Sequence, residues 1–293
     1  MEIYRNIWRK ILISKAGIIY GMGDALNARA FLLTYCKQKG YPTERIKIYT
    51  DRFWYLFEKE GFKRELNKAN HRGLVGYHNF CNYDLPKIYK TDKCDECIAR
   101  NAGIDFSFDT IVPLNWNTKL NFDLPRKFVT VNYGSGEDLK VGEQCIKMWD
   151  IKYWEKLVMS IGVPVVQIGG GRTVKTIKGC TLNLENKLSI FQSAEVMKRA
   201  LFHIDIEGGL PILNQHLGGR SVVLFGACAI ENQGRSFNLN LRSNTCTPCY
   251  EWGTHKHTRL KYKISEIGCN IECMRDLKPE YVIEQIYKKG WLV

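Results

Sequence analysis

Residues 202–228 hold the densest group of residue types that could bind a phosphate-bearing ligand. The stretch reads as a strand, a glycine turn, a helix and a buried strand, with Asp205 near the end of the first strand and the turn at Glu207-Gly208-Gly209. A helix that begins directly after two glycines points unpaired N–H groups and the positive end of its dipole at a ligand. Open α/β sheets bind phosphates at this place. The alternative is an ordinary strand–helix–strand crossover that uses glycines for tight turns.

Two other strand ends carry residues of the same kind. Asp24 follows a glycine turn at the carboxyl edge of the first strand, at or beside the N-cap of the next helix. Ser135 and Gly136 follow a later strand, and such a glycine and hydroxyl loop can present N–H groups to a phosphate. Helix capping is the structural alternative for Asp24, and core or capping roles are the alternative for Ser135 and Asp205.

Four of the eleven cysteines have the spacing of a metal site, namely Cys246, Cys249, Cys269 and Cys273. Two close pairs, separated by nineteen residues, suit a tetrahedral site. Zinc is the default ion for sulfur-only ligands, and iron in a rubredoxin-like site uses the same ligands. A metal-free loop packed by reduced thiols is the alternative. Cys94 and Cys97 form a similar pair without a partner pair nearby, and we predict no metal there.

Composition indicates a soluble globular protein with an anionic partner. A chain of 293 residues predicts two domains, and no apolar run reaches the roughly 18 residues that span a membrane. The N-terminus lacks the pattern of a signal peptide, so we expect a cytoplasmic protein with reduced thiols. The net charge of +13 suits phosphorylated substrates or peripheral contact with the anionic inner face of a membrane. Dispersed Lys and Arg argue against nucleic acid, and part of the excess can be compositional.

Two series of alternating strands and helices predict an α/β protein with two domains. The first series has strands at 9–14, 45–51 and 73–78 and helices at 25–39 and 53–60. The second has strands at 127–132, 163–168, 201–206 and 221–225 and helices at 146–162, 188–199, 210–217 and 279–289. The polar, proline-punctuated stretch 109–125 separates them. We therefore predict domains at 1–120 and 121–278, with a last segment, 279–293, that crosses back to the first domain.

The ordered motifs resemble those of the heptosyltransferases, a family of inverting GT-B glycosyltransferases that use ADP-activated heptose. The matching pieces are G-M-G-D-A-L, V-N-Y-G-S-G, K-M-W-D, V-V-Q-I-G-G, D-I-E-G-G-L, V-V-L-F-G, C-T-P-C and C-N-I-E-C-M-R-D-L-K-P-E-Y-V. They follow one another along nearly the whole chain. The resemblance implies a GT-B fold, in which two Rossmann-like domains face across a cleft, and transfer of a heptose or related sugar to a saccharide or protein hydroxyl.

The resemblance also implies a role for each candidate residue. Asp24 is the base that takes the proton of the acceptor hydroxyl, and Lys147 neutralises the diphosphate in place of a catalytic metal. The rest of the donor site is Ser135, Gly136, Gly169, Gly208 and Gly209, with Asp205 or Glu207 on ribose or sugar hydroxyls. Some protein-glycosylating relatives resemble this chain in the cysteine segment.

The sequence departs from the family pattern at two positions where the nucleotide sugar is bound. These departures affect the expected identity of the donor more than the expected type of reaction. Ile212 stands where family members usually carry a histidine, and Glu207 begins a variant of the usual D-[ST]-G. A catalytically degenerate GT-B module that binds through its basic surface is therefore the alternative function. Retention of Asp24 and Lys147 together favours the enzyme.

Overall fold

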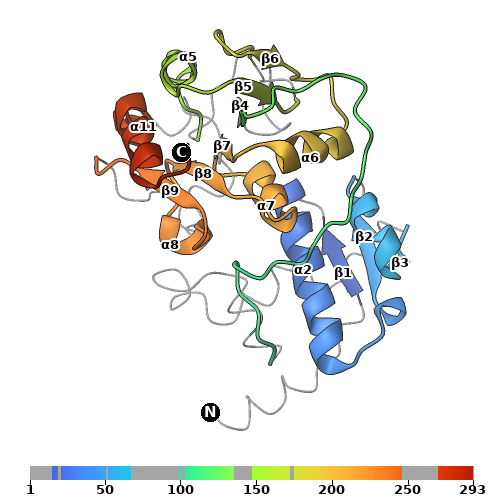
Figure 1. Cartoon of the computed structure of the whole chain (residues 1–293). Coiled ribbons are helices and arrows are strands. Elements are labelled where there is room, and N and C mark those ends of the chain that lie inside the picture. Colours follow the sequence, from blue (N-terminus) through green and yellow to red (C-terminus); the bar gives the residue numbers. More distant parts are fainter. Residues whose placement is uncertain are drawn as a thin grey trace. The chain divides into compact units, whose positions relative to one another are not determined.

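The computed structural model consists of two compact units, Met1–Val112 and Pro113–Val293 (Figure 1). The structure describes residues 15–18, 21–50, 52–66, 99, 103–134, 147–171, 175–245 and 270–292. The predicted domain boundary lies at residues 120 and 121, whereas the compact units divide at Val112 and Pro113.

The first unit contains a parallel sheet in the order β1-β2-β3, with β1 (Lys15–Ile18), β2 (Lys47–Thr50) and β3 (Lys63–Arg64). Helix α2 (Met22–Lys39) joins β1 to β2 and ends at Gly40, whose φ of 60° is the left-handed conformation that glycine adopts readily. The predicted strands at 9–14 and 73–78 lie outside the described residues.

The predicted helix at 53–60 is wrong. The structure has two short 3-10 helices there, Trp54–Leu56 and Glu58–Glu60, and Gly61 follows with a φ of 82°. Aromatic residues lose rotamer freedom in an α-helix, and a helix of eight residues before a glycine forms few hydrogen bonds to offset that loss.

The second unit contains a six-stranded sheet in which all neighbouring strands are parallel. Its order is β6-β5-β4-β7-β8-β9, where β4 is Val129–Asn132, β5 Val165–Ile168, β6 Leu182–Asn183, β7 His203–Ile206, β8 Ser221–Phe225 and β9 Leu239–Arg242. If these six strands are numbered 1 to 6 from β4 to β9, their order in the sheet is 3-2-1-4-5-6, the arrangement of a Rossmann domain. All residues of β4, β5, β7 and β8 are buried, as expected for parallel strands covered on both faces.

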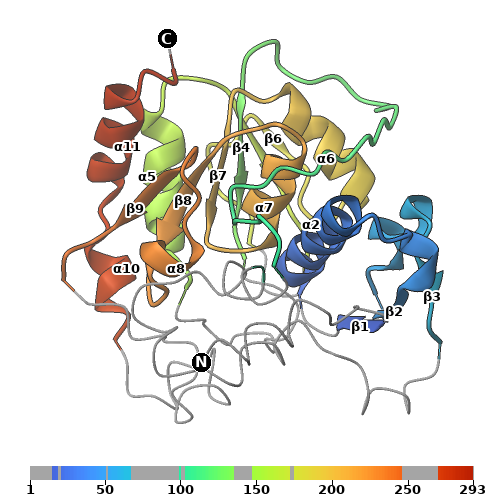
Figure 2. The ribbon, with the colours of Figure 1, turned by 90° about the horizontal axis from the view of Figure 1, so that it is seen from below.

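Helices cover both faces of this sheet (Figure 2). On one face lie α5 (Ile151–Ser160) and α11 (Pro279–Lys288), which pack against each other, and on the other face α6 (Ile190–Arg199) packs against α7 (Gly209–His216). A short helix, α8 (Ile230–Gln233), follows β8. Another short helix, α10 (Glu272–Asp276), directly precedes α11. Asp150 caps α5 by accepting a hydrogen bond from the backbone N–H of Lys152 at 2.8 Å, and Ser189 and Gln192 form a capping box on α6.

Residues 113–125 and the last helix both belong to the second unit. The backbone N–H of Leu114 donates to the carbonyl oxygen of His216 at 2.9 Å, and the Trp116 ring contacts Phe191 with centroids 4.7 Å apart. This part of the stretch predicted as a linker therefore packs on α6 and α7. The last helix, predicted to cross back to the first domain, buries Val282 and Ile286 in the core of the second unit.

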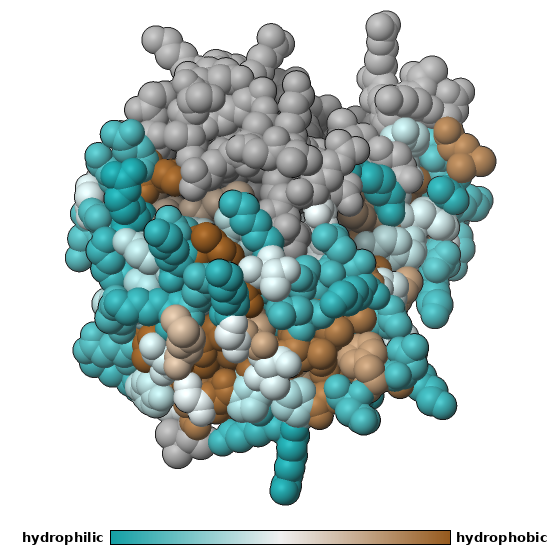
Figure 3. All heavy atoms as spheres, turned by 90° about the horizontal axis from the view of Figure 1, so that it is seen from above, coloured by the Kyte–Doolittle hydropathy of each residue, from teal (hydrophilic) through white to brown (hydrophobic). Residues whose placement is uncertain are grey.

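No helix among the described residues is long and apolar enough to cross a membrane. In Figure 3 hydrophilic side chains cover much of the face that is drawn in colour, with hydrophobic side chains gathered in one part of it. The large exposed hydrophobic residues among those described are Leu66, Ile111, Met159, Tyr281 and Tyr287, and both tyrosines lie on α11.

Candidate active site

The strand order of the second unit defines where a ligand can bind. Connections from β4 run toward β6, whereas connections from β7 run toward β9, so the chain reverses direction between these two central strands. In open α/β sheets the ligand crevice lies beyond the carboxyl ends of the strands at this switch point. Asn132 ends β4, and Glu207 and Gly208 follow β7. The sequence-predicted turn at Glu207-Gly208-Gly209 therefore lies at the switch point.

Helix α7 begins at this crevice with Gly209 as its first residue and Gly208 as its N-cap. Gly208 is in extended backbone, with a φ of 177°, and a Cβ placed there would meet nothing closer than the Ile206 carbonyl oxygen at 3.8 Å. Pro211 is buried in the first turn, where its missing N–H costs no helical hydrogen bond. The first N–H groups of α7 and its dipole thus face the switch point, as a phosphate requires.

Lys147 and Glu207 form an ion pair at the same edge of the sheet. Both side chains are largely buried, with exposed fractions of 16% and 17%. Burial by itself raises the pKa of Glu207, but the charge and hydrogen bond of Lys147, a hydrogen bond from Cys228 and the charge of Arg235 outweigh burial and lower that pKa below its ordinary value. The ionised form of Glu207 is therefore favoured, and Lys147 is its ion-pair partner.

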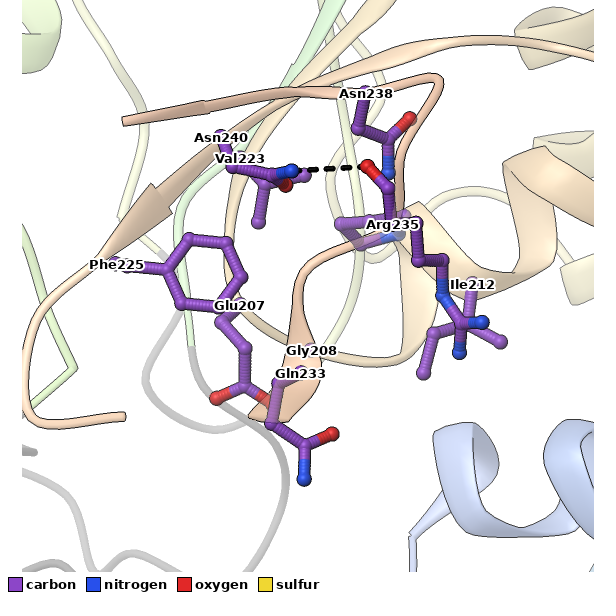
Figure 4. A pocket seen from close by; sticks show the side chains of 10 residues that line it. Glu207, Gly208, Ile212, Val223, Phe225, Gln233, Arg235, Asn238 and Asn240 are labelled. Atoms are coloured by element: carbon purple, nitrogen blue, oxygen red, sulfur yellow. Dashed lines mark hydrogen bonds between the residues drawn. The ribbon is translucent and has the colours of Figure 1, made fainter. Parts of the chain in front are cut away.

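A pocket adjoins this ion pair, between the turn after β7, the first turn of α7 and the segment that joins α8 to β9 (Figure 4). Its lining combines polar and apolar side chains: Glu207, Gly208, Pro211, Ile212, Val223, Phe225, Gln233, Arg235, Asn238 and Asn240. Arg235 is only 4% exposed. Sequence reasoning missed Arg235 and Cys228 because their proximity to Glu207 depends on the path of the chain after β8, which no motif signals.

Asp205 lies beneath the crevice in a buried hydrogen-bond network. The side-chain amide of Asn132 donates to its two carboxylate oxygens at 3.0 and 3.1 Å, and the backbone N–H of Ile206 donates to Oδ1 at 2.7 Å. His203 Nε2 lies 3.3 Å from Oδ2, and its Nδ1 lies 3.0 Å from the Thr130 hydroxyl. Burial raises the pKa of Asp205, against the opposing effects of His203, Asn132 and Ile206. The network ties β4 to β7, which places Asp205 in a supporting position under the site.

Gly169 is needed for the turn after β5. Its φ is 108°, and a Cβ at this position would lie 2.0 Å from Asn132 Oδ1. Only glycine therefore allows the backbone to pass this close to the buried network. A polar residue at the end of the β4 strand pattern was the sequence signal that could have identified Asn132.

Asp24 belongs to the first unit, in the first turn of α2. Its carboxylate Oδ2 accepts a hydrogen bond from the backbone N–H of Gly21 at 3.2 Å, as the third residue of a capping box does. Asp24 is partly exposed and lies where the chain leaves β1. Asp24 therefore caps α2 with a carboxylate that is partly exposed near the carboxyl end of β1.

Most of the predicted metal ligands and part of the phosphate loop lie outside the described residues. These are Ser135, Gly136, Cys246, Cys249 and Cys269. Cys273 is described and is buried on α10. Within the described ranges no group of three or more His, Cys, Asp or Glu is placed to hold a metal ion.

Comparison with known proteins identifies the fold. No protein-family model matches the sequence, and no curated protein matches it significantly. Among solved structures, the iron-containing dodecameric glycosyltransferase TibC of enterotoxigenic E. coli H10407 is similar with a TM-score of 0.66 and 13% identity, over 94% of this chain and 77% of TibC. TibC has also been solved as a heptosyltransferase in complex with ADP-D-beta-D-heptose.

Two further solved structures match over nearly the full length of both chains. A glycosyl transferase family 9 protein from Veillonella parvula DSM 2008 has a TM-score of 0.58 and 11% identity, over 95% of this chain and 96% of that one. The E. coli ADP-heptose lps heptosyltransferase II has a TM-score of 0.55 and 13% identity, over 96% and 98%. The chain has the α/β fold of these glycosyltransferases, the GT-B class that the sequence analysis predicts.

Proposed function

We propose that this protein is a glycosyltransferase that moves a heptose or related sugar from an ADP-activated donor to a saccharide or protein hydroxyl, with inversion at the anomeric carbon. The observation that carries the proposal is the position of Lys147 and the first turn of α7 at the switch point of a fold shared with glycosyltransferases. A lysine and a helix N-terminus are the groups that a diphosphate needs, because both meet its negative charge.

The reaction assigns one task to each group. The Asp24 carboxylate takes the proton of the acceptor hydroxyl, and the acceptor oxygen forms a bond to the anomeric carbon of the sugar. The bond from that carbon to the diphosphate oxygen breaks on the opposite face, and its electron pair leaves with the nucleoside diphosphate. Lys147 and the N–H groups of Gly208 and Gly209 then stabilise the added charge. Asp205 and Asn132 hold the strand ends that carry this site.

Release of nucleoside diphosphate from activated sugars tests the proposal. The protein is mixed with ADP-, UDP- and GDP-activated sugars, with and without saccharide or peptide acceptors, and the free diphosphate is measured. We expect release from the ADP-sugar above the other two, and faster release when an acceptor is present. No release from any donor, together with tight binding of nucleotide, supports the binding-module alternative.

We further propose a structural zinc or iron ion on Cys246, Cys249, Cys269 and Cys273. The Thr245 hydroxyl donates to Asp276 Oδ2 at 2.6 Å, which brings the residue before Cys246 onto α10, the helix that carries Cys273. Thr245, which directly precedes Cys246 in the chain, is thus held at the helix that carries Cys273, and this supports one tetrahedral site. Thiolates would hold the ion and cross-link the segment, with no part in sugar transfer.

Elemental analysis tests the metal proposal. Protein purified without chelators should contain about one zinc or iron ion per chain. Replacing Cys273 with serine should lower that content and the melting temperature, whereas replacing Cys36, buried in the first unit, should leave the metal content unchanged. Metal-free protein with all four thiols open to titration would contradict the proposal.

A further inference from the structure

Glu207 is paired with one cation and shares a pocket with a second. Its carboxylate forms the ion pair with Lys147, and it lines the same pocket as the buried Arg235 (Figure 4). The three side chains together carry one net positive charge. The cation assigned to the diphosphate is therefore already neutralised by Glu207 in the ligand-free protein.

Binding of a diphosphate to Lys147 requires a change in this arrangement. Glu207 and the phosphate oxygens are both anions, and both compete for the same ammonium group. A largely buried carboxylate that loses its partner without gaining another is strongly destabilised. The donor site therefore needs a second cation that holds Glu207 while Lys147 holds the diphosphate.

We propose that Arg235 is this second cation, a positioning residue that retains Glu207 and so releases Lys147 to the donor. The inference rests on the proposed function and adds a residue to it. An arginine suits the task because its guanidinium stays charged when buried and offers several donors to a carboxylate.

Two further observations support the assignment. The charge of Arg235 already contributes to the lowered pKa of Glu207. The backbone of Arg235 is fixed independently of its side chain, since its carbonyl oxygen accepts hydrogen bonds from the Asn238 N–H at 3.1 Å and from Asn240 Nδ2 at 2.9 Å. The Arg235 side chain therefore extends from a fixed backbone and lines the pocket.

A double-mutant cycle on ADP affinity tests the proposal, with calorimetric titration of ADP into four proteins. These are the wild type, Arg235→Met, Glu207→Gln and the double variant. We expect Arg235→Met to weaken ADP binding by on the order of tenfold, because Glu207 then stays on Lys147. We expect Glu207→Gln to strengthen ADP binding by on the order of tenfold more in the Arg235→Met background than in the wild type.

The difference between the effects of Glu207→Gln in the two backgrounds measures the coupling between Glu207 and Arg235. This coupling distinguishes the proposal from direct binding of the diphosphate by Arg235. If Arg235 binds the diphosphate itself, the two substitutions act additively, and that result overturns the proposal. Arg235→Lys, which keeps the charge, should retain most of the affinity. Arg235→Gln, which removes the charge but keeps a polar side chain, serves as the second variant if Arg235→Met does not fold.

A matched control removes a positive charge outside the pocket. Arg242 pairs with Glu231 at 3.0 Å on the surface of the same unit, so Arg242→Met should leave ADP affinity unchanged. Equal losses of ADP affinity in Arg235→Met and Arg242→Met would show that the effect comes from the net charge of the protein, and would contradict the proposal. A wild type that binds no nucleoside diphosphate would refute the proposed function itself, whereas normal ADP binding with an additive cycle refutes only the role of Arg235.

Discussion

Replacing Asp24 with asparagine is expected to lower turnover by on the order of 10²–10⁴ while nucleotide affinity stays unchanged. The amide has the shape of the carboxylate but cannot accept the proton of the acceptor hydroxyl. Steady-state kinetics with the preferred donor, together with calorimetric nucleotide affinity, measure the two quantities separately.

The capping contact of Asp24 makes asparagine the informative substitution. Asparagine keeps an oxygen that can accept from the Gly21 N–H, so the start of α2 should survive. If Asp24 only caps the helix, turnover of Asp24→Asn stays close to native. Asp24→Ala, which removes the cap as well, should also lower the melting temperature.

Replacing Lys147 with alanine is expected to weaken nucleotide binding by on the order of 10²-fold and to lower turnover as well. The lysine charge meets phosphate in both the ground state and the transition state, so both quantities change together. The substitution also leaves the buried Glu207 carboxylate close to the diphosphate without its ion-pair partner. Calorimetry and kinetics on the same preparation measure both effects.

Lys156 offers a matched control for this substitution. It lies on α5 of the same unit, is 56% exposed, and pairs with Glu280 at the surface. Lys156→Ala should change neither affinity nor turnover, because exposed ion pairs contribute little. An Lys147→Ala protein with native affinity for nucleotide would remove Lys147 from the donor site.

Much of the second unit could be predicted from the sequence because its elements are specified locally. The apolar strands at β5, β7 and β8 and the glycine turn before α7 appear at their predicted places within a few residues. The helix at 53–60 fails since its aromatic side chains pack in 3-10 turns, which depends on tertiary contacts and not on periodicity.

The candidate site could be predicted only in part, for a related reason. Glu207, Gly208 and Gly209 are recognisable because a strand end and a helix start are signals within a few residues. Lys147 could be predicted only because its motif, K-M-W-D, resembles a motif of the heptosyltransferases. The ion pair with Glu207 spans 60 residues, and its neighbour Arg235 lies on a segment without any motif. Such contacts follow from strand order, which a linear pattern does not encode.

Calorimetric titration of the wild-type protein with ADP, UDP and GDP tests the central claim most directly. A nucleotide-sugar transferase with its donor site at the switch point should bind about one ADP per chain, with a dissociation constant on the order of micromolar and weaker binding of UDP and GDP. Failure of all three diphosphates to bind to folded protein would contradict the account.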